Sequence, residues 1–327
     1  MAIQLVASAR IPDEKPYAAW EDILARMSRY SFFQTPAWTE TILRALPGTS
    51  THHRWFRFSD DVEMILPLIA IPKYRILSKL ESLPWGTYGG MIGIGIGVDH
   101  VALALKKLIS LRSPTIAITC PPQSLTLPDR ESSRFHISKR TTHLLELDPP
   151  FEEIFQTRFQ PRARTAIRRA RESGCKVSWA KDRAAMAALK ILYIAAAKKW
   201  EANLAIPETF FDTLEGCSEE QVRVWSVEKE GRILAADLIF YGKGEAHYHT
   251  GARHEESDLP EANKFLMSEI IRDACARGYR TFNFGASAGL TGVEQFKEIF
   301  GGVKTDYYTL TSFHLFFERI LLQILHG

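Results

Sequence analysis

The chain has 327 residues, of which 46% are hydrophobic and 24% are charged, and its formal net charge is +3. This composition excludes an intrinsically disordered or fibrous protein, and the small net charge excludes a chain that binds polyanions over its whole surface. The length exceeds that of one ordinary hydrophobic core and predicts about two domains.

The cysteine pattern indicates the compartment. The cysteines stand far apart, with no CxxC pair and no neighbouring histidine at ligand spacing: Cys120, Cys175, Cys217 and Cys275. This pattern favours reduced thiols and a cytoplasmic protein, and it indicates neither a disulfide framework nor a zinc site. The first residues lack the basic and long apolar stretches of a signal peptide. No apolar run approaches the ~18 residues of a membrane span, so we expect no transmembrane segment.

The first part of the chain alternates helical and extended patterns. Helices are predicted over 16–27 and 36–46, the second with Pro36 in its first turn. Strands predicted over 51–59 and 62–71 flank a turn-forming Ser-Asp-Asp cluster, which is typical of an antiparallel hairpin.

Glycines punctuate residues 82–99, SLPWGTYGGMIGIGIGVD. Their spacing lacks the GxGxxG pattern of a dinucleotide site, so we expect a close-packed strand leading into a helix over 99–111, capped by Asp99. Buried strands are predicted over 113–120 and 134–147. The Asp-Pro-Pro that follows is the best domain boundary in the chain.

A basic helix is predicted over 161–173, before Gly174. Arg164, Arg168 and Arg171 recur at i, i+4 and i+7 on one face. Three guanidinium groups on one face repel one another unless an anion joins them, which favours a phosphate-bearing ligand. The diphosphate of coenzyme A and the backbone of a tRNA acceptor stem fit equally well. The alternative is a solvated basic face.

A strand predicted over 232–241 is apolar on both faces, as in a central strand, except at Asp237. A buried carboxylate costs several kcal/mol unless it is hydrogen-bonded or protonated, so Asp237 should have a partner or a raised pKa. Such tuning suits a general base that deprotonates an attacking amine. The alternative is a structural carboxylate.

The following segment, EAHYHTGAR, puts His247 and His249 on one face of a strand and Tyr248 on the other. His249 is a second candidate base, and Tyr248 could hydrogen-bond a substrate. No third ligand accompanies the histidines, so we expect no metal site. Helices are also predicted over 182–200 and 260–277.

The segment GVEQFKEIFGG predicts a short helix at the carboxyl end of a buried strand. Phe296 and Phe300 share one face with Val293. Lys297 lies beside that face, and Gly301 can adopt the left-handed backbone conformation that ends a helix. A lysine next to aromatic packing is unusual, and the alternative is a surface lysine on a capped helix.

These residues carry a family resemblance. Phe296, Lys297, Phe300 and Gly301 form FKxxFG, which resembles the closing signature of the Fem-type peptidyltransferases, relatives in the GNAT superfamily of N-acyltransferases. Other segments fit the same pattern in the same order: FFQTPAW, RARTAIRRARESG, GRILAADLIFYGKGEAHYHTGAR, LPEANKFL and ARGYRTFNFG.

The resemblance implies an α/β (α+β) fold of two tandem GNAT-like domains, each a mixed, mostly antiparallel sheet flanked by helices. The domains would span residues 1–148 and 149–312. An apolar helix over 313–327 would pack back on the first domain, and the alternative for this tail is a contact with a membrane surface or a second subunit.

The implied activity is N-acyl transfer by a bacterial enzyme. An acyl or aminoacyl group would move from acyl-CoA or aminoacyl-tRNA to an amine of a peptidoglycan or other cell-envelope precursor, a small-molecule or lipid-linked acceptor. The resemblance implies no tightly bound cofactor and no DNA partner.

The resemblance also implies roles for residues. Lys297 would be a cation near the developing oxyanion or the donor phosphate, and Phe296 would shape the acyl position. Lys199 falls where relatives carry a basic residue near the acceptor. Asp237 or His249 would accept the proton, and the three arginines of the basic face would hold the donor phosphates.

One departure from most GNAT enzymes concerns the donor. Their basic, glycine-rich turn before the helix expected over 260–277 holds the coenzyme A diphosphate. Here that loop has no glycine and carries acids at Glu255, Glu256, Asp258 and Glu261. These acids favour the Fem-like branch. Two alternatives stay open: an acetyl-CoA-dependent N-acetyltransferase for an amino sugar or metabolite, and a non-catalytic GNAT-fold binding or scaffold protein.

Overall fold

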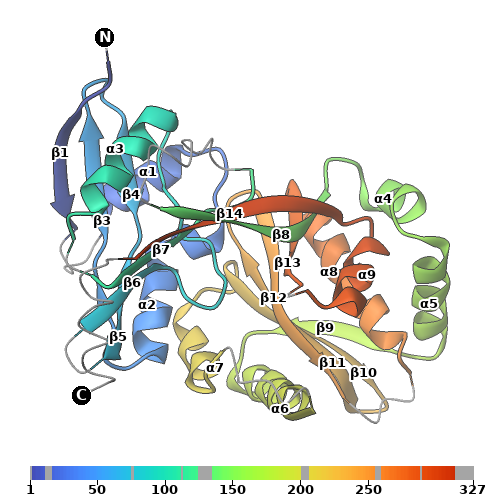
Figure 1. Ribbon diagram of the computed structural model, residues 1–327. Coiled ribbons are helices and arrows are strands. Elements are labelled where there is room, and N and C mark those ends of the chain that lie inside the picture. Colours follow the sequence, from blue (N-terminus) through green and yellow to red (C-terminus); the bar gives the residue numbers. More distant parts are fainter. Residues whose placement is uncertain are drawn as a thin grey trace. The chain divides into compact units, whose positions relative to one another are not determined.

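The computed structural model describes residues 2–11, 17–74, 77–111, 113–123, 135–199, 206–254, 259–287 and 289–313. The chain forms two compact units. The first comprises Met1–Met27, Phe33–Arg140 and Asp306–Gly327, and the second comprises Ser28–Phe32 and Thr141–Thr305. Both units combine helices with mostly antiparallel strands (Figure 1), which confirms the predicted fold class.

The first unit contains strands in the orders β1-β3-β4 and β2-β5-β6-β7-β14. The strands are β1 (Leu5–Arg10), β2 (Ser50–Thr51), β3 (Arg54–Phe58), β4 (Glu63–Leu66), β5 (Ile69–Tyr74), β6 (Leu77–Ser82), β7 (Thr115–Thr119) and β14 (Val303–Phe313). The helices are α1 (Ala18–Arg26), α2 (Pro36–Ala45) and α3 (Val98–Leu108). Leu105 of α3 packs with Phe56 of β3 and Ile118 of β7 in the core of this unit.

The prediction of a strand within residues 82–99 is wrong. Ser82 is the last residue of β6, and after it only Ile92 forms a bridge in this segment, with Ile65. Gly90 and Gly95 adopt left-handed backbone angles, with φ of +58° and +75°, which interrupt an extended chain. The apolar alternation of this segment therefore does not indicate pairing.

Two boundaries in this unit also differ from prediction. The strand expected over 62–71 is two strands, β4 and β5, because the Leu68 amide donates to Nδ1 of His53 between them (3.0 Å). Helix α3 begins at Val98, so Asp99 lies in its first turn instead of capping it. A carboxylate there still interacts favourably with the helix dipole.

The second unit contains the strand order β8-β13-β12-β11-β10-β9, in which β8 contributes its residues from Thr141 onward. The strands are β8 (His136–Glu146), β9 (Lys176–Ala180), β10 (Val222–Lys229), β11 (Arg232–Tyr241), β12 (Glu245–Arg253) and β13 (Thr281–Ala286). The helices are α4 (Phe151–Thr157), α5 (Pro161–Glu172), α6 (Arg183–Lys199), α7 (Thr209–Thr213), α8 (Ala262–Ala276) and α9 (Thr291–Glu298). Strands β12 and β13 pair in parallel.

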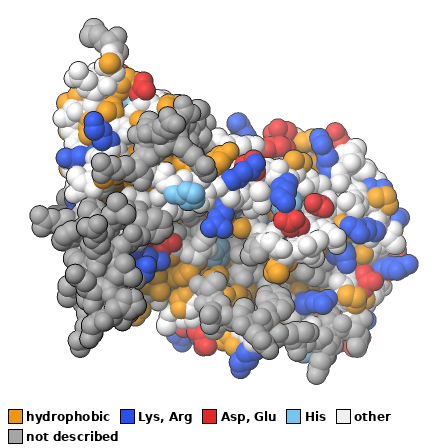
Figure 2. Space-filling model, in the orientation of Figure 1, with side chains coloured by type: hydrophobic (Ala, Val, Ile, Leu, Met, Phe, Trp, Pro, Cys, Tyr) orange, Lys and Arg blue, Asp and Glu red, His pale blue; other side chains and the backbone are white. Residues whose placement is uncertain are grey.

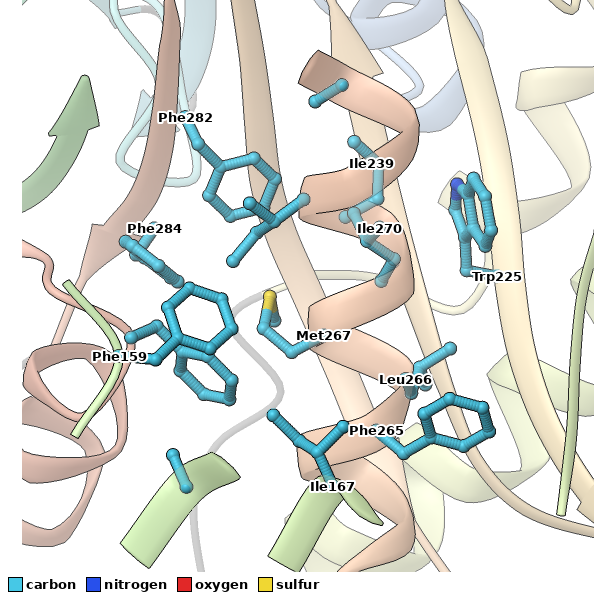
Figure 3. Close-up of a cluster of buried hydrophobic side chains, with 14 of the residues drawn as sticks. Phe159, Ile167, Trp225, Ile239, Phe265, Leu266, Met267, Ile270, Phe282 and Phe284 are labelled. Carbon is cyan, nitrogen blue, oxygen red and sulfur yellow. The ribbon is translucent and has the colours of Figure 1, made fainter. Parts of the chain in front are cut away.

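Helices cover both faces of this sheet. Helix α8 packs on β10 and β11 with α4 and α5 beside it, and α6 packs on β11 and β12 with α7 beside it. Figure 3 shows the core under α8, where Ile270 lies near Ile239 of β11 and Leu266 lies one turn away on the helix, beside Phe265. Burying each such side chain contributes about 1.5–3 kcal/mol, so this core fixes α8 against the strands that carry the candidate site.

Residues 28–32 run against the end of β11 and the turn that joins β11 to β12. Tyr30 forms a bridge with Lys243, and the ring of Phe32 stacks on Phe240 at 5.0 Å. A Cβ atom on Gly242 would overlap the carbonyl oxygen of Tyr30 and lie 2.7 Å from the amide nitrogen of Phe32. Glycine is therefore required for the close approach of these two backbones.

We predict that Gly242→Ala lowers the free energy of unfolding by about 1–3 kcal/mol, because the added methyl group pushes residues 28–32 away from the turn between β11 and β12. Gly292→Ala is the control, since a Cβ there meets no atom within 4 Å. It should gain up to about 1 kcal/mol from helix propensity. Urea unfolding measures both, and equal losses would contradict the expectation.

Candidate active site

Helix α9 presents the FKxxFG residues at the end of β13. The rings of Phe296 and Phe300 lie 5.2 Å apart, and Phe300 meets Phe159 at 5.1 Å. Gly301 has φ +82°, and a Cβ atom there would lie 2.7 Å from Cβ of Arg158. Gly301 therefore allows both the left-handed end of the helix and its close packing.

Lys297 is buried, with 2% of its surface exposed, so the surface-lysine alternative is wrong. Its Nζ atom donates a hydrogen bond of 2.6 Å to the carbonyl oxygen of Gly285. Burial lowers the pKa of Lys297 from 10.5 to about 8, and Glu294 opposes that shift. A group with this pKa can hold or release a proton near neutral pH.

The carbonyl group that holds Lys297 is itself fixed. Gly285 has φ +71°, and its amide donates to Oδ1 of Asn283 (2.9 Å). The hydroxyl of Thr142 donates to the same oxygen (2.8 Å). A Cβ atom on Gly285 would lie 2.9 Å from the carbonyl oxygen of Tyr248. Sequence reasoning missed Asn283 and Thr142, because their partnership joins β13 to β8.

A cavity of about 470 Å³ opens beside Lys297. The pairing of β12 with β13 covers only residues 245–247 and 281–283, and residues just beyond it line the cavity. The residues that matter below are Tyr248, Gly251, Asn263, Phe284, Phe296 and Lys297. The parallel strands thus stop pairing where the cavity begins.

Asp237 lies on β11 opposite Gly251 and has 1% of its surface exposed. Burial raises the pKa of Asp237 well above its usual range, as predicted. Its Oδ2 atom has no hydrogen-bond partner among the described residues. A Cβ atom on Gly251 would overlap Oδ1 of Asp237 and lie 2.7 Å from the hydroxyl oxygen of Tyr248. The carboxyl group therefore lies directly behind the cavity wall.

The histidines of β12 lie on the other face of the strand. The His249 ring lies 6.3 Å from that of His247, 5.3 Å from Phe240 and 5.8 Å from Phe210. Burial lowers the pKa of His249 to about 3 and lowers that of His247 as well. Tyr248 lines the cavity and His249 does not. Asp237 is thus the candidate base nearer the cavity.

Basic and acidic side chains are interspersed on the face that Figure 2 shows, so any anion site must be local. Two of the three predicted arginines have partners within the chain. Arg164 donates to the carbonyl oxygens of Gln156 and Phe159, and Arg171 pairs with Glu269 at 3.0 Å. Arg168 is exposed.

A neighbouring face of α5 lines a groove of about 600 Å³. Arg162 and Arg169 lie in it together with Lys264 of α8. The groove and the cavity share Lys264, Gly292 and Phe296, so the two are adjacent. The periodicity of the sequence predicted a basic helix, but it could not show which arginines of that helix line the groove.

Some predicted features lie outside the described residues. These are the side chain of Lys199, the loop acids Glu255, Glu256 and Asp258, and the helix expected at the end of the chain. Ala196, one turn before Lys199 on α6, lines the cavity. Among the described helices, none combines the length and apolarity that a membrane span needs.

Comparison with known proteins supports the fold. Residues 157–298 match the family described as "Acetyltransferase (GNAT) domain", and no curated protein matches the sequence. A structure titled "Crystal structure of FemX" aligns with TM-score 0.64 and 12% identity over 93% of this chain and 97% of that one.

Two further solved structures cover almost the whole chain. The C-terminal domain of a putative lysylphosphatidylglycerol synthetase from Agrobacterium fabrum gives TM-score 0.59 and 13% identity over 93% of each chain. A tandem GNAT protein from the clavulanic acid biosynthesis pathway gives 0.54 and 13% over 95% of this chain and 98% of that one. The family match and these folds confirm the predicted resemblance.

We predict that Lys297→Met raises the free energy of unfolding at pH 7 by about 1–2 kcal/mol. The folded protein disfavours the charged lysine, so the unfolded chain binds more protons between pH about 8 and 10.5, and wild-type stability rises over that window. Urea unfolding at pH 7 and 9.5 measures the effect. Lys304→Met, at an exposed ion pair with Glu294, is the control. Destabilisation of Lys297→Met at pH 7 would contradict this assignment.

Proposed function

We propose that this chain, which contains a GNAT domain and shares its fold with FemX and a tandem GNAT protein, transfers an aminoacyl group from an RNA-borne ester to an amine of a cell-envelope precursor. The observation that carries the proposal is a buried lysine at the wall of a cavity that adjoins a basic groove. The cavity would take the acyl group and the groove its carrier.

Lys297 would act on the carbonyl group of the donor. An ammonium group has three N–H donors, and the hydrogen bond to Gly285 uses one of them. The remaining donors can stabilise the oxyanion that forms when the amine attacks. Such a contact gains strength in a site shielded from water. Phe296, which lines both the cavity and the groove, would border the acyl group.

The pKa of Lys297 also suits the proton transfers. The carbon–nitrogen bond forms, the carbon–oxygen bond of the ester breaks, the leaving oxygen gains a proton and the amine loses one. With its pKa lowered to about 8 by burial, Lys297 can give its proton to the leaving oxygen and regain one from the amine. The overall reaction then neither takes up a proton from solvent nor releases one.

The groove would hold the phosphates of the carrier. Arg162, Arg169 and Lys264 line it against one acid, Glu261. Guanidinium and ammonium groups bind phosphate through charge-assisted hydrogen bonds. A donor with an acyl group and a phosphate-bearing carrier could therefore place the acyl group in the cavity and the phosphates in the groove.

Related folds support the aminoacyl donor and the envelope acceptor. The name lysylphosphatidylglycerol synthetase describes the joining of a lysyl group to a lipid, and that domain has a similar fold over 93% of each chain. The resemblance of the FKxxFG segment to the Fem-type peptidyltransferases adds a peptidoglycan precursor as the acceptor class. All four cysteines are free thiols, which suits the reducing cytoplasm where such precursors are made.

A second candidate is acetyl-CoA-dependent N-acetylation of an amino sugar or metabolite. It is favoured by the family match and by the cavity where β12 and β13 stop pairing. Calorimetric titration with coenzyme A separates the two. Micromolar binding that weakens in Lys297→Ala supports this candidate, and no heat at millimolar ligand removes it. If Lys297→Ala keeps full biological activity, a non-catalytic scaffold role is favoured instead.

We predict that Lys297→Ala lowers kcat/KM with the ester donor by about 10²–10³-fold, because one oxyanion donor is lost. Wild-type kcat/KM should fall as pH rises through about 8, where Lys297 loses its proton. Lys297→Arg should lack that alkaline limb, since guanidinium stays protonated. A pH profile of transfer from aminoacylated RNA minihelices measures this. If Lys297→Arg shows the same loss of kcat/KM above pH about 8, a group other than Lys297 causes that loss.

We predict that Arg169→Ala raises KM for the RNA donor about tenfold and reduces the slope of log K against log salt by about 1, since one phosphate contact is lost. Arg168→Ala is the matched control, because Arg168 is exposed on the same helix and does not line the groove. Donor binding at several salt concentrations measures both. Equal effects of the two substitutions would refute a specific groove.

A further inference from the structure

Two buried polar groups of the second unit are complementary, and each lacks a hydrogen-bond partner. Within the described residues, Oε1 of Glu245 accepts no hydrogen bond and Nδ2 of Asn283 donates none. Glu245 has 3% of its surface exposed and Asn283 has 0%, so water does not replace the missing partner. Because an unpaired buried polar group destabilises a folded protein, native structures pair such groups.

The two side chains lie on neighbouring strands of the sheet (Figure 1). β12 and β13 run in parallel, with Glu245 opposite Thr281 and His247 opposite Asn283. Residues two apart on a strand point to the same face, so Glu245 and Asn283 share a face, one diagonal step apart. Burial raises the pKa of Glu245, and Arg29 and Asn283 are among the groups that lower it. The amide of Asn283 therefore lies within reach of the carboxyl group.

The other polar atoms of both side chains already have partners. Oδ1 of Asn283 accepts from the amide of Gly285 (2.9 Å) and from the hydroxyl of Thr142 (2.8 Å). Because a backbone amide can only donate, the oxygen and nitrogen atoms of the Asn283 side chain are assigned without ambiguity. Oε2 of Glu245 lies 3.5 Å from Nη2 of Arg29. Oε1 of Glu245 and Nδ2 of Asn283 are thus the atoms left to pair.

Asn283 connects this pair to the candidate site. It holds the amide of Gly285, and the carbonyl oxygen of Gly285 accepts the hydrogen bond of 2.6 Å from Nζ of Lys297. That hydrogen bond favours the protonated lysine, so the position of the carbonyl group contributes to the pKa of Lys297. Burial lowers this pKa, and the acid whose charge opposes the shift is Glu294. An effect of Glu245 on Lys297 therefore passes through Asn283.

We propose that Glu245 is a positioning residue for Lys297. Nδ2 of Asn283 donates to Oε1 of Glu245, and this hydrogen bond keeps the carbonyl group of Gly285 within reach of the lysine. The inference deepens the proposed function and rests on it for the role of Lys297. It also ties the lysine to residues 28–32, which pair with Glu245 and are preceded and followed in sequence by residues of the first unit.

The test follows the titration of Lys297 by NMR, through the carbon next to Nζ in protein labelled at lysine. Lys297→Met identifies the signal, and the wild-type pKa should be about 8. Glu245→Leu removes the acceptor and should lower the pKa of Lys297 by about 0.5–1, because the protonated lysine is held less well. Glu245→Gln keeps an acceptor oxygen in the same place and should leave this pKa at its wild-type value.

The other charged or titratable groups that act on Lys297 leave this measurement clear. They are Glu294 of its own helix, His143 of β8 and His247 of β12. Burial lowers the pKa of both histidines, so both are neutral over the pH range in which Lys297 titrates. All three residues are the same in every variant.

Two controls separate positioning from a general loosening of the sheet. Thr281→Val deletes the hydrogen bond from Thr281 to Oε2 of Glu146 (3.4 Å), which also joins β13 to β8, and it should leave the pKa of Lys297 unchanged. The double variant Glu245→Leu/Asn283→Ala should shift that pKa no further than Asn283→Ala alone, since the two residues act in series.

Kinetics give a second measurement. In transfer from aminoacylated RNA minihelices, Glu245→Leu should lower kcat about tenfold and keep KM within about twofold, because the lysine is displaced while the groove is intact. If the wild-type protein transfers nothing from RNA, the proposed function fails, whereas the titration of Lys297 still decides whether Glu245 positions it.

Several results would overturn the inference. These are an unshifted pKa of Lys297 in Glu245→Leu, an equal shift in Thr281→Val, an equal shift in Glu245→Gln, and additive shifts in the double variant. If the Glu245 variants do not fold, the wild-type protein decides. A scalar coupling between Nδ2 of Asn283 and the carboxyl carbon of Glu245 supports the hydrogen bond, and its absence refutes it.

Discussion

The hydrogen bond from Lys297 to the carbonyl oxygen of Gly285 is the interaction on which the candidate site depends. It orients the only cation that the described cavity wall buries completely, and its acceptor is oriented in turn by Asn283. Gly285 adopts a left-handed conformation where the pairing of β13 with β8 shifts register, between Asn283 and Ala286, and its carbonyl oxygen there accepts the hydrogen bond from Lys297. The FKxxFG residues thus work as one structural unit with the strand before them.

Burial acts in opposite directions on the two acid–base groups of the cavity. It lowers the pKa of Lys297 to about 8 and raises the pKa of Asp237, so each is driven towards its neutral form. His247 and His249 of β12 are also neutral, since burial lowers the pKa of both. In a buried site of this kind, a charge that develops during a reaction interacts strongly with the few polar groups that can stabilise it.

Much of the fold and part of the site could be predicted from the sequence. Hydrophobic periodicity located α5, α6, α8 and β11, and the polar residue within an apolar strand identified Asp237 as buried. Local patterns could not show that Asn283 meets Thr142, because β13 and β8 come together only in the folded sheet. Likewise, the choice of Arg162 and Arg169 over Arg164 depends on where α8 packs, which helix periodicity leaves undetermined.

The division of the chain between the two units has a consequence for synthesis on the ribosome. Residues 309–313 of β14 pair with 115–119 of β7, so the first unit gains this strand only after residues 309–313 have been made. The second unit, in contrast, uses residues 28–32, which emerge early. The first unit therefore gains its strand β14 only after the segments of the second unit have been made. Until then β7 exposes an unpaired edge, which is the kind of surface that chaperones protect in nascent chains.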